Sequence, residues 1–250
     1  MAQPWPLYRA LKGLERPLRI PPEPGCICEF GPAGAYLVDT ITTQLRPQLQ
    51  AMRGAMRTCF DRDRRSINYS GLSPNQLPVR GRFHELYVEP CGFGDTLCTN
   101  VSFLAVAKTT PRGQPVGFLT FSVGCSVESK SRALYVTVTL HCAWLAPRHR
   151  GRGNGRNLAE AVAHALASFL ERLQLLAATG VKRPRALSVE ISIEGDVYSK
   201  SGEQFVYTTE AAVAQWFEDV GVEGVELLGV TSVCVPIEAV SRSGKPALPC

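Results

Sequence analysis

The feature that most constrains this chain is a long strand-forming run that leads through a basic, glycine-rich turn into a helical run. Residues 133–146 (ALYVTVTLHCAWLA) are dominated by residue types that favour β-strands. Residues 148–156 (RHRGRGNGR) then place three glycines and four arginines within nine positions. From Leu158 to Leu176, apolar residues recur every three or four positions, which predicts one face of a helix. A strand, a glycine turn and a helix in this order predict an α/β fold with free backbone N–H groups at the start of the helix.

Composition favours a globular chain that needs no covalent cross-links. Of its 250 residues, 45% are hydrophobic and 20% are charged, and the net charge is +5. The sequence contains no apolar run of about 18 residues, the length needed for a membrane span, and its first twenty residues do not resemble a secretion signal. The nine cysteines are an odd number and are scattered, which predicts reduced thiols and a cytoplasmic location. The pair Cys26 and Cys28 lacks a second pair at zinc-binding spacing, so no metal site is predicted.

Changes in composition divide the chain into three parts. Residues 1–35 are rich in proline and glycine and show little periodicity, which predicts an N-terminal arm lying on the domain or partly mobile. Residues 36–240 carry the periodic segments and form the predicted domain. Residues 241–250 (SRSGKPALPC) form a polar C-terminal tail.

Within the domain, the periodic segments alternate between helices and strands. Leu45, Leu49, Met52, Met56 and Cys59 predict a helix that begins between positions 39 and 47. A loop-rich connection at 66–98 with one short strand near 84–89 is expected next. Four further elements follow the same reasoning: a hairpin of 102–108 and 116–124, a strand at 185–195, a helix at 208–221 with a threonine cap, and one or two strands at 225–237. Together they predict an α/β fold with a central mixed, mostly antiparallel sheet flanked by helices.

The glycine turn suits a phosphate group, because glycines allow close approach to backbone N–H groups at the positive end of a helix dipole. It lacks the lysine of a P-loop, and its spacing G-x-G-x-G differs from the dinucleotide fingerprint G-x-G-x-x-G. The run RGRGNG does match R/Q-x-x-G-x-G/A, with Arg150, Gly153 and Gly155 in the fixed positions. With Pro147 before it and Leu158 after it, this run resembles the pyrophosphate loop of the GNAT acyltransferase superfamily. The resemblance extends over roughly residues 36–236.

This resemblance implies a GNAT acyltransferase fold and acetyl-CoA as co-substrate. In such a loop, the backbone N–H groups approach the pyrophosphate and the arginines supply positive charge. A solvated basic turn and an RGG-like nucleic-acid segment are the alternatives, but the latter is typically disordered, whereas this run lies between a strand and a helix. The implied acetyl-CoA-binding residues are Leu145, Arg150, Gly151, Arg152, Gly153, Asn154, Gly155 and Arg156.

The resemblance also implies where transfer to an amine would take place. The oxyanion donor is a backbone N–H near the end of the long strand, at Ala143, and Leu145 would pair with the pantetheine arm as a pseudo-strand. The position of a common base in this superfamily holds Thr139, which cannot serve. His141 is the preferred candidate base, predicted to share a face with Ala143 and Leu145, and Glu190 and Glu194 are the alternatives.

The usual general acid of the superfamily is a tyrosine in the late helix, and Phe217 occupies its place here. Tyr198, Tyr207 or water are the alternatives for protonating the thiolate. The implied function is an N-acetyltransferase that transfers an acyl group to a primary amine by direct attack in a ternary complex. The alternative is a catalytically weak acyl-CoA-binding or protein-interaction module on the same fold. The acceptor, a small molecule or a protein amine, is expected to contact residues 57–72 and 194–205.

Overall fold

The computed structural model of the chain describes most of the predicted domain and part of the predicted arm. The described residues are 5–13, 18–19, 34–38, 41–62, 85–90, 96–110, 113–130, 133–179 and 186–236, and for 18–19 and 85–90 only the backbone is described.

The described residues form one eight-stranded sheet at the centre of the molecule. Its strand order is β1-β3-β4-β5-β6-β7-β8, and β2 pairs with β4 beside β3. The pairs from β1 to β6 are antiparallel, whereas β6 with β7 and β7 with β8 are parallel. The predicted mixed sheet is therefore confirmed. The strands are β1 (Leu18–Arg19), β2 (Ala35–Leu37), β3 (Glu85–Pro90), β4 (Thr96–Lys108), β5 (Pro115–Glu128), β6 (Ala133–Leu145), β7 (Leu187–Val197) and β8 (Val225–Pro236).

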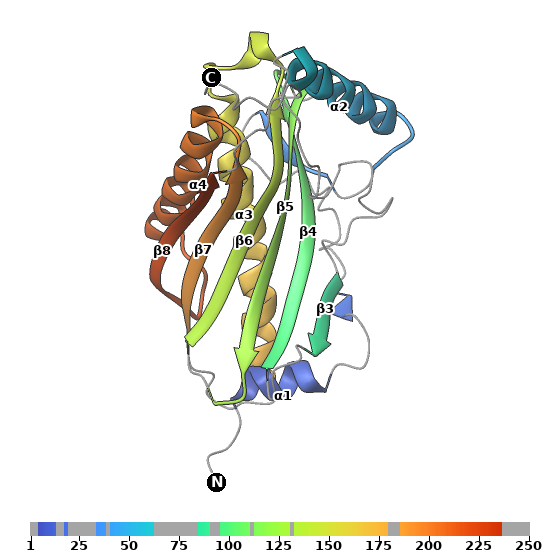
Figure 1. Ribbon diagram of the computed structural model, residues 1–250. Helices are drawn as coiled ribbons and strands as arrows, with labels where there is room; N and C mark the ends of the chain where they lie inside the picture. Colours follow the sequence, from blue (N-terminus) through green and yellow to red (C-terminus); the bar gives the residue numbers. More distant parts are fainter. Residues whose placement is uncertain are drawn as a thin grey trace.

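Helices cover the sheet unequally on its two faces (Figure 1). α3 (Asn154–Ala178) and α4 (Lys200–Asp219) pack together on one face, because each connects two neighbouring parallel strands. α1 (Pro6–Lys12) packs against α3 on the same side. α2 (Leu45–Arg62) covers the other face, where it packs over the upper ends of β4, β5 and β6. Two apolar clusters result, a large one under α3 and a smaller one under α2.

The predicted helices after position 39 and after the glycine turn are present. α2 buries Leu49, Met52 and Met56 and carries Pro47 in its first turn, as the periodicity predicts. α3 begins at Asn154, four residues before the apolar period starts, because the last residues of the glycine turn form its first turn. Gly180, its predicted end, lies outside the described residues.

The helix α1 was missed in the sequence, because prolines and basic residues surround its short apolar period. Leu7 and Leu11 are fully buried in the cluster under α3, and Tyr8 is almost so. Pro6 stands at the first helical position, where its missing N–H costs nothing. Part of the predicted arm therefore belongs to the core, while the boundary at residues 35 and 36 stays a prediction.

α4 begins eight residues earlier than predicted. Its N-cap is Ser199, whose hydroxyl accepts a hydrogen bond from the N–H of Gly202. The predicted threonine cap is wrong, because Thr208 and Thr209 lie inside the helix and donate to the carbonyls four residues before them. Most of the acceptor loop expected at 194–205 is consequently strand end and helix start.

The strands around the predicted hairpin are longer than expected. β4 begins at Thr96, inside the segment expected to be loop-rich, and β5 runs four residues beyond its predicted end. The short strand expected near 84–89 is present as β3, whereas 63–84 lies outside the described residues. The segment at 225–237 forms a single strand, β8.

Two compositional expectations can be compared with the structure. Cys98 is disulfide-bonded, so the expectation that all nine cysteines are reduced is wrong for this residue. Four others, Cys59, Cys125, Cys142 and Cys234, are free thiols. None of the described helices is long and apolar enough to cross a membrane.

Candidate functional site

The site predicted from the sequence lies where β6 outruns its partner β7. β6 pairs with β7 from Ala133 to Leu140, and from Tyr135 onwards it also pairs with β5 on its other side. Beyond Leu140 it pairs only with β5, and it continues for five more residues to Leu145. Figure 1 shows β6 running on past the end of β7 towards the top of the molecule. The upper part of β6 therefore presents one open edge among the described residues.

A β-bulge at His141 marks the point where the open edge begins. Thr120 of β5 pairs with Cys142 and the next residue, Phe121, pairs with Leu140, so His141 is an extra residue in β6. An extra residue reverses the alternation of side chains beyond it. Leu140 lies in the cluster under α3, Cys142 packs against the cluster under α2, and Leu145 packs against the α3 side again.

The bulge makes one prediction wrong: His141 does not share a face with Ala143 and Leu145. Its Nε2 forms a 2.9 Å hydrogen bond with the hydroxyl of Ser122. Ser122 alternates with Phe121 and Val123, which face α3, so Ser122 and His141 lie on the opposite face of the sheet. The sequence pattern could not show the extra residue, because the apolar alternation is compatible with either register.

The direction of the backbone groups at the open edge follows from the alternation along a strand. The N–H of Ala146 donates to Val116 of β5. Because successive residues direct their N–H and C=O groups to opposite edges, those of Ala143 and Leu145 point away from β5, towards the open edge. The Leu145 carbonyl accepts a 3.0 Å hydrogen bond from the Arg150 guanidinium, which confirms this direction. Ala143 thus has the backbone orientation that the predicted oxyanion donor requires.

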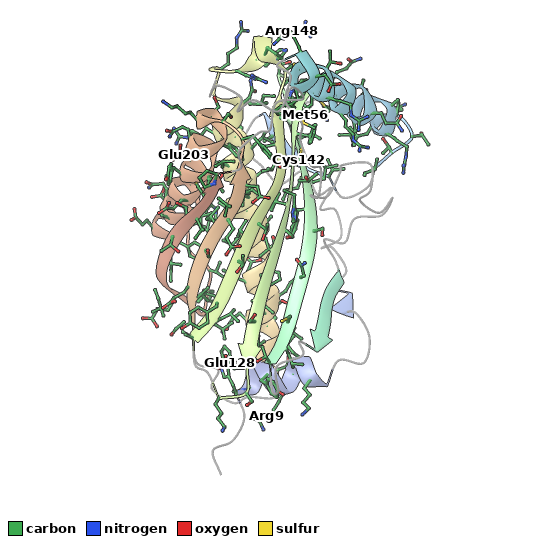
Figure 2. The ribbon with its side chains drawn as sticks, in the orientation of Figure 1. Arg9, Met56, Glu128, Cys142, Arg148 and Glu203 are labelled. Carbon is green, nitrogen blue, oxygen red and sulfur yellow. The ribbon has the colours of Figure 1, made fainter. Side chains whose placement is uncertain are left out.

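The glycine turn connects this edge to α3 through a short 3₁₀ helix, η3 (Pro147–His149). Gly151 and Gly153 have φ angles of 68° and 80°, in the left-handed region that favours glycine. The side-chain amide of Asn154 donates a 2.9 Å hydrogen bond to the backbone carbonyl of His149, which fixes the start of α3 against η3. Figure 2 shows Arg148 at the same upper end of the molecule as Cys142 and Met56. The turn is thus tied to η3 by a side-chain hydrogen bond at the start of α3.

The first turn of α3 leaves its backbone N–H groups available. The N-cap is Gly153, none of the side chains that the structure describes caps this end, and the first hydrogen bond within the helix is donated by Asn157. The N–H groups of Asn154, Gly155 and Arg156 therefore have no partner in the helix. Together with the helix dipole, they form a site that suits an anion.

Gly155 is a glycine that the fold itself does not require. Its φ angle lies outside the left-handed region, and a Cβ there would meet only Leu145 Cδ1, at an ordinary contact distance of 3.9 Å. Inside a helix, glycine costs up to about 1 kcal/mol relative to alanine. A ligand that must approach the N–H groups closely would account for it. The same contact places the first turn of α3 directly beside the end of the open edge.

The arginines of the turn differ in what they contact. Arg150 bonds the Leu145 carbonyl, and Arg148 donates to His149. Arg156 forms a 3.0 Å ion pair with Glu160, and its side chain is 75% exposed. Arg152 forms no hydrogen bond or ion pair with any other described residue and is exposed. Arg152 is therefore the arginine most available to an incoming anion.

Two residues that the sequence analysis missed surround His141. Ser122 holds its Nε2, and the carboxylate of Asp196, at the end of β7, acts on it electrostatically. Burial lowers the pKa of His141 from its ordinary 6.5, and the Asp196 charge partly opposes this shift. His141 is therefore neutral at neutral pH. The register of β5 and β6 brings Ser122 to His141, and the sequence pattern does not reveal that register.

The alternative carboxylates lie at different heights along β7. Glu194 pairs with Thr139, two residues from His141. Glu190 pairs with Tyr135, about 20 Å further down the strand from His141. The structure therefore brings Glu194, and not Glu190, close to the beginning of the open edge.

The candidate acids are also separated by the fold. Tyr207 is exposed on α4, where the charges of Cys234 and Glu203 raise its pKa, and it faces β8 rather than β6. Phe217 stacks edge-on against Trp216 near the end of α4. The part of α4 that lies beside the upper end of β7 is at Val206, next to Gly195. Phe217 is about 16 Å further along the helix than Val206. A hydroxyl at position 217 would therefore not reach the open edge. Tyr198, directly after β7, is the nearest of the three to it.

A groove of about 360 Å³ lies between α3 and α4 next to the glycine turn. It begins at Arg156, in the first turn of α3, and extends to Trp216, whose ring meets that of His164. Its volume is within the range of small-molecule sites. The anion site at the start of α3 thus continues into a concave surface.

Within the described parts of the chain, no group of three or more His, Cys, Asp or Glu side chains is placed to hold a metal ion. A scan against protein-family models and searches of curated proteins and of solved structures return no match. Membership of the GNAT superfamily stays a prediction from the loop residues. What the structure shows is an α/β fold with a mixed sheet flanked by helices.

Proposed function

We propose that this protein is an acetyl-CoA-dependent N-acetyltransferase with a GNAT-type site at the upper end of β6. One observation carries the proposal: the open edge at Ala143 and Leu145 leads directly to the uncapped start of α3. The free backbone groups of the β6 edge are thus followed along the chain by the free N–H groups at the start of α3, which suit an anion. Acetyl-CoA has the matching order of groups, with a thioester and amides in its pantetheine arm followed by a pyrophosphate.

Each part of the site has a role in this proposal. The Leu145 N–H would donate to a carbonyl of the pantetheine arm, and the N–H groups of Asn154, Gly155 and Arg156 would bind the pyrophosphate. Arg152 would add positive charge, and the groove between α3 and α4 has room for the adenosine end. The remaining predicted residues, Arg150, Gly151 and Gly153, would shape the turn.

The transfer itself would use the N–H of Ala143 and the imidazole of His141. The amine nitrogen attacks the thioester carbonyl carbon, and the Ala143 N–H donates to the oxygen that becomes negative. The amine proton passes to His141, directly or through water, the C–S bond breaks, and the thiolate of CoA takes a proton from solvent or Tyr198. Because His141 lies on the α2 face and Ala143 presents its N–H at the edge, the acceptor would approach from the α2 face.

Titration calorimetry with acetyl-CoA tests the binding part of this proposal. We expect micromolar affinity for the wild type and no measurable binding for Gly155→Val, because the side chain blocks the N–H groups. Gly54→Val is the matched control, because Gly54 is a helical glycine like Gly155. An added Cβ at Gly54 would have nothing within 4 Å. Normal affinity in Gly155→Val, with unfolding midpoints alike in both variants, would contradict the proposal.

An assay for the free thiol of CoA separates transfer from binding alone. With a panel of small amines and lysine peptides, we expect thiol release that depends on both the amine and acetyl-CoA. Tight binding with no release for any amine would favour the alternative of an acyl-CoA-binding module.

A further inference from the structure

The strand β8 ends the sheet with an edge that is long for an edge strand. It spans twelve residues and pairs with β7 on one side, and no described strand pairs with its other side. Figure 1 shows it as the outermost strand, at the left of the sheet. At the opposite end of the sheet, β1 has only two residues. Strand edges of this length are usually protected, because unpaired N–H and C=O groups bind other strands.

The upper part of β8 carries few of the features that protect edge strands. Residues 229–235 (GVTSVCV) contain no charged residue and no proline. The only charge of the strand, Glu226, and a bulge at Leu228 both lie below this segment, and Pro236 ends it. Val233 and Val235 are 47% and 50% exposed. An uncharged, β-branched edge segment of this length is typical of a strand that pairs with another chain.

We propose that the edge of β8 pairs antiparallel with the same edge of a second copy of this chain. The side chains of the segment itself carry no charge, so they meet no like charge when the segment pairs with itself. Glu203 and Glu210 of α4 lie near Cys234 and Ser232, on the face opposite Val233. With the two-fold axis at Val233, the two copies of Val233 stand opposite each other. Thr231 of each copy then stands opposite Val235 of the other, so each cross-strand pair on this face joins β-branched side chains.

This dimer does not depend on the proposed activity. β7 separates β8 from β6, so the open edge at Ala143 and Leu145 stays accessible in both copies. The result is a sheet that continues from one copy to the next, and the backbone groups of the joined segment that point away from β7 gain partners.

Size-exclusion chromatography with light scattering on the full chain, at tens of micromolar, tests the dimer. We expect twice the chain mass for the wild type and a single chain mass for Val233→Lys, which places two like charges opposite each other at the axis. The matched control is Val220→Lys, because Val220 is a more exposed valine, at 70%, that lies outside β8. It should keep the wild-type mass, and all three proteins should have the same circular dichroism spectrum.

A charge-swap mixture makes the test specific for the register. Val233→Glu should also be monomeric, and mixing it with Val233→Lys should restore a dimer, because opposite charges then meet at the axis. A monomeric wild type, or a Val233→Lys that keeps the double mass, would overturn the proposal. So would a wild type that dimerises only after residues 237–250 are removed, because the chain's own end would then occupy the edge.

Discussion

The two halves of β6 differ in what pairs with them rather than in their tendency to form a strand. In the lower half, Ala133–Leu140, β7 pairs with the whole length and β5 pairs from Tyr135, and alternate side chains are buried under α3. In the upper half, His141–Leu145, β5 is the only described strand that pairs with it, and Ala143 is exposed. The lower half therefore contributes to stability, while the upper half has backbone groups left to bind something else. The extra residue His141 lies at the boundary between the two.

The largest effect should come from placing the same carboxylate in each half. Val138 is fully buried in the lower half, so Val138→Asp should cost about 4 kcal/mol of unfolding free energy or more, by burying an unpaired charge. Ala143→Asp, at an exposed position of the upper half, should change it by less than about 1 kcal/mol. Urea unfolding monitored by circular dichroism measures both. Equal costs for the two variants would remove the distinction between the halves.

A smaller effect is expected at the boundary residue. If His141 accepts the amine proton, His141→Ala should lower turnover by about 10²-fold and leave acetyl-CoA affinity within a few-fold, because only the transition state loses an interaction. Steady-state thiol release and calorimetry measure the two quantities. A folded variant with wild-type turnover would make His141 a packing residue, and Glu194 would become the better candidate.

The smallest effect concerns the pH dependence of turnover. A base must be neutral to accept a proton, so the rate should rise with pH along a limb whose midpoint lies below the ordinary histidine pKa of 6.5, since burial lowers the pKa of His141. Asp196 raises this pKa, so Asp196→Asn should move the rising limb to lower pH. Glu226→Gln, which removes a carboxylate from β8, should leave the limb in place. A limb that stays in place in Asp196→Asn would show that another group titrates.

The strong periodic elements could be predicted from the sequence, because burial on one face dictates them. α2, α3 and the strands β5, β6 and β7 lie where apolar periodicity places them, apart from their ends. The glycine turn could be predicted as well, since its glycines and arginines are local. The start of α4 could not, because Thr208 and Thr209 look like caps until tertiary structure extends the helix back to Ser199.

The environment of the candidate base could not be predicted, because it depends on register. A single extra residue in β6 turns His141 away from Ala143, and neither composition nor spacing reveals such a residue. Ser122 and Asp196 come from two neighbouring strands, and only the pairing brings them to His141. Phe217 is a different case. Its spacing in the sequence matches the position of the usual general acid, but it lies near the end of α4, too far from the open edge to act there.

Amide hydrogen exchange followed by NMR tests the central claim most directly, because it observes both halves of β6 at once. Without ligand, the N–H groups of Ala143 and Leu145 should exchange fast, whereas those flanked by β5 and β7 on both sides, from Tyr135 to Val138, should exchange slowly. Saturation with acetyl-CoA should slow exchange at Ala143, Leu145 and the first turn of α3 and leave the lower half unchanged. Slow exchange at Ala143 and Leu145 without ligand, or no change on saturation, would contradict the account.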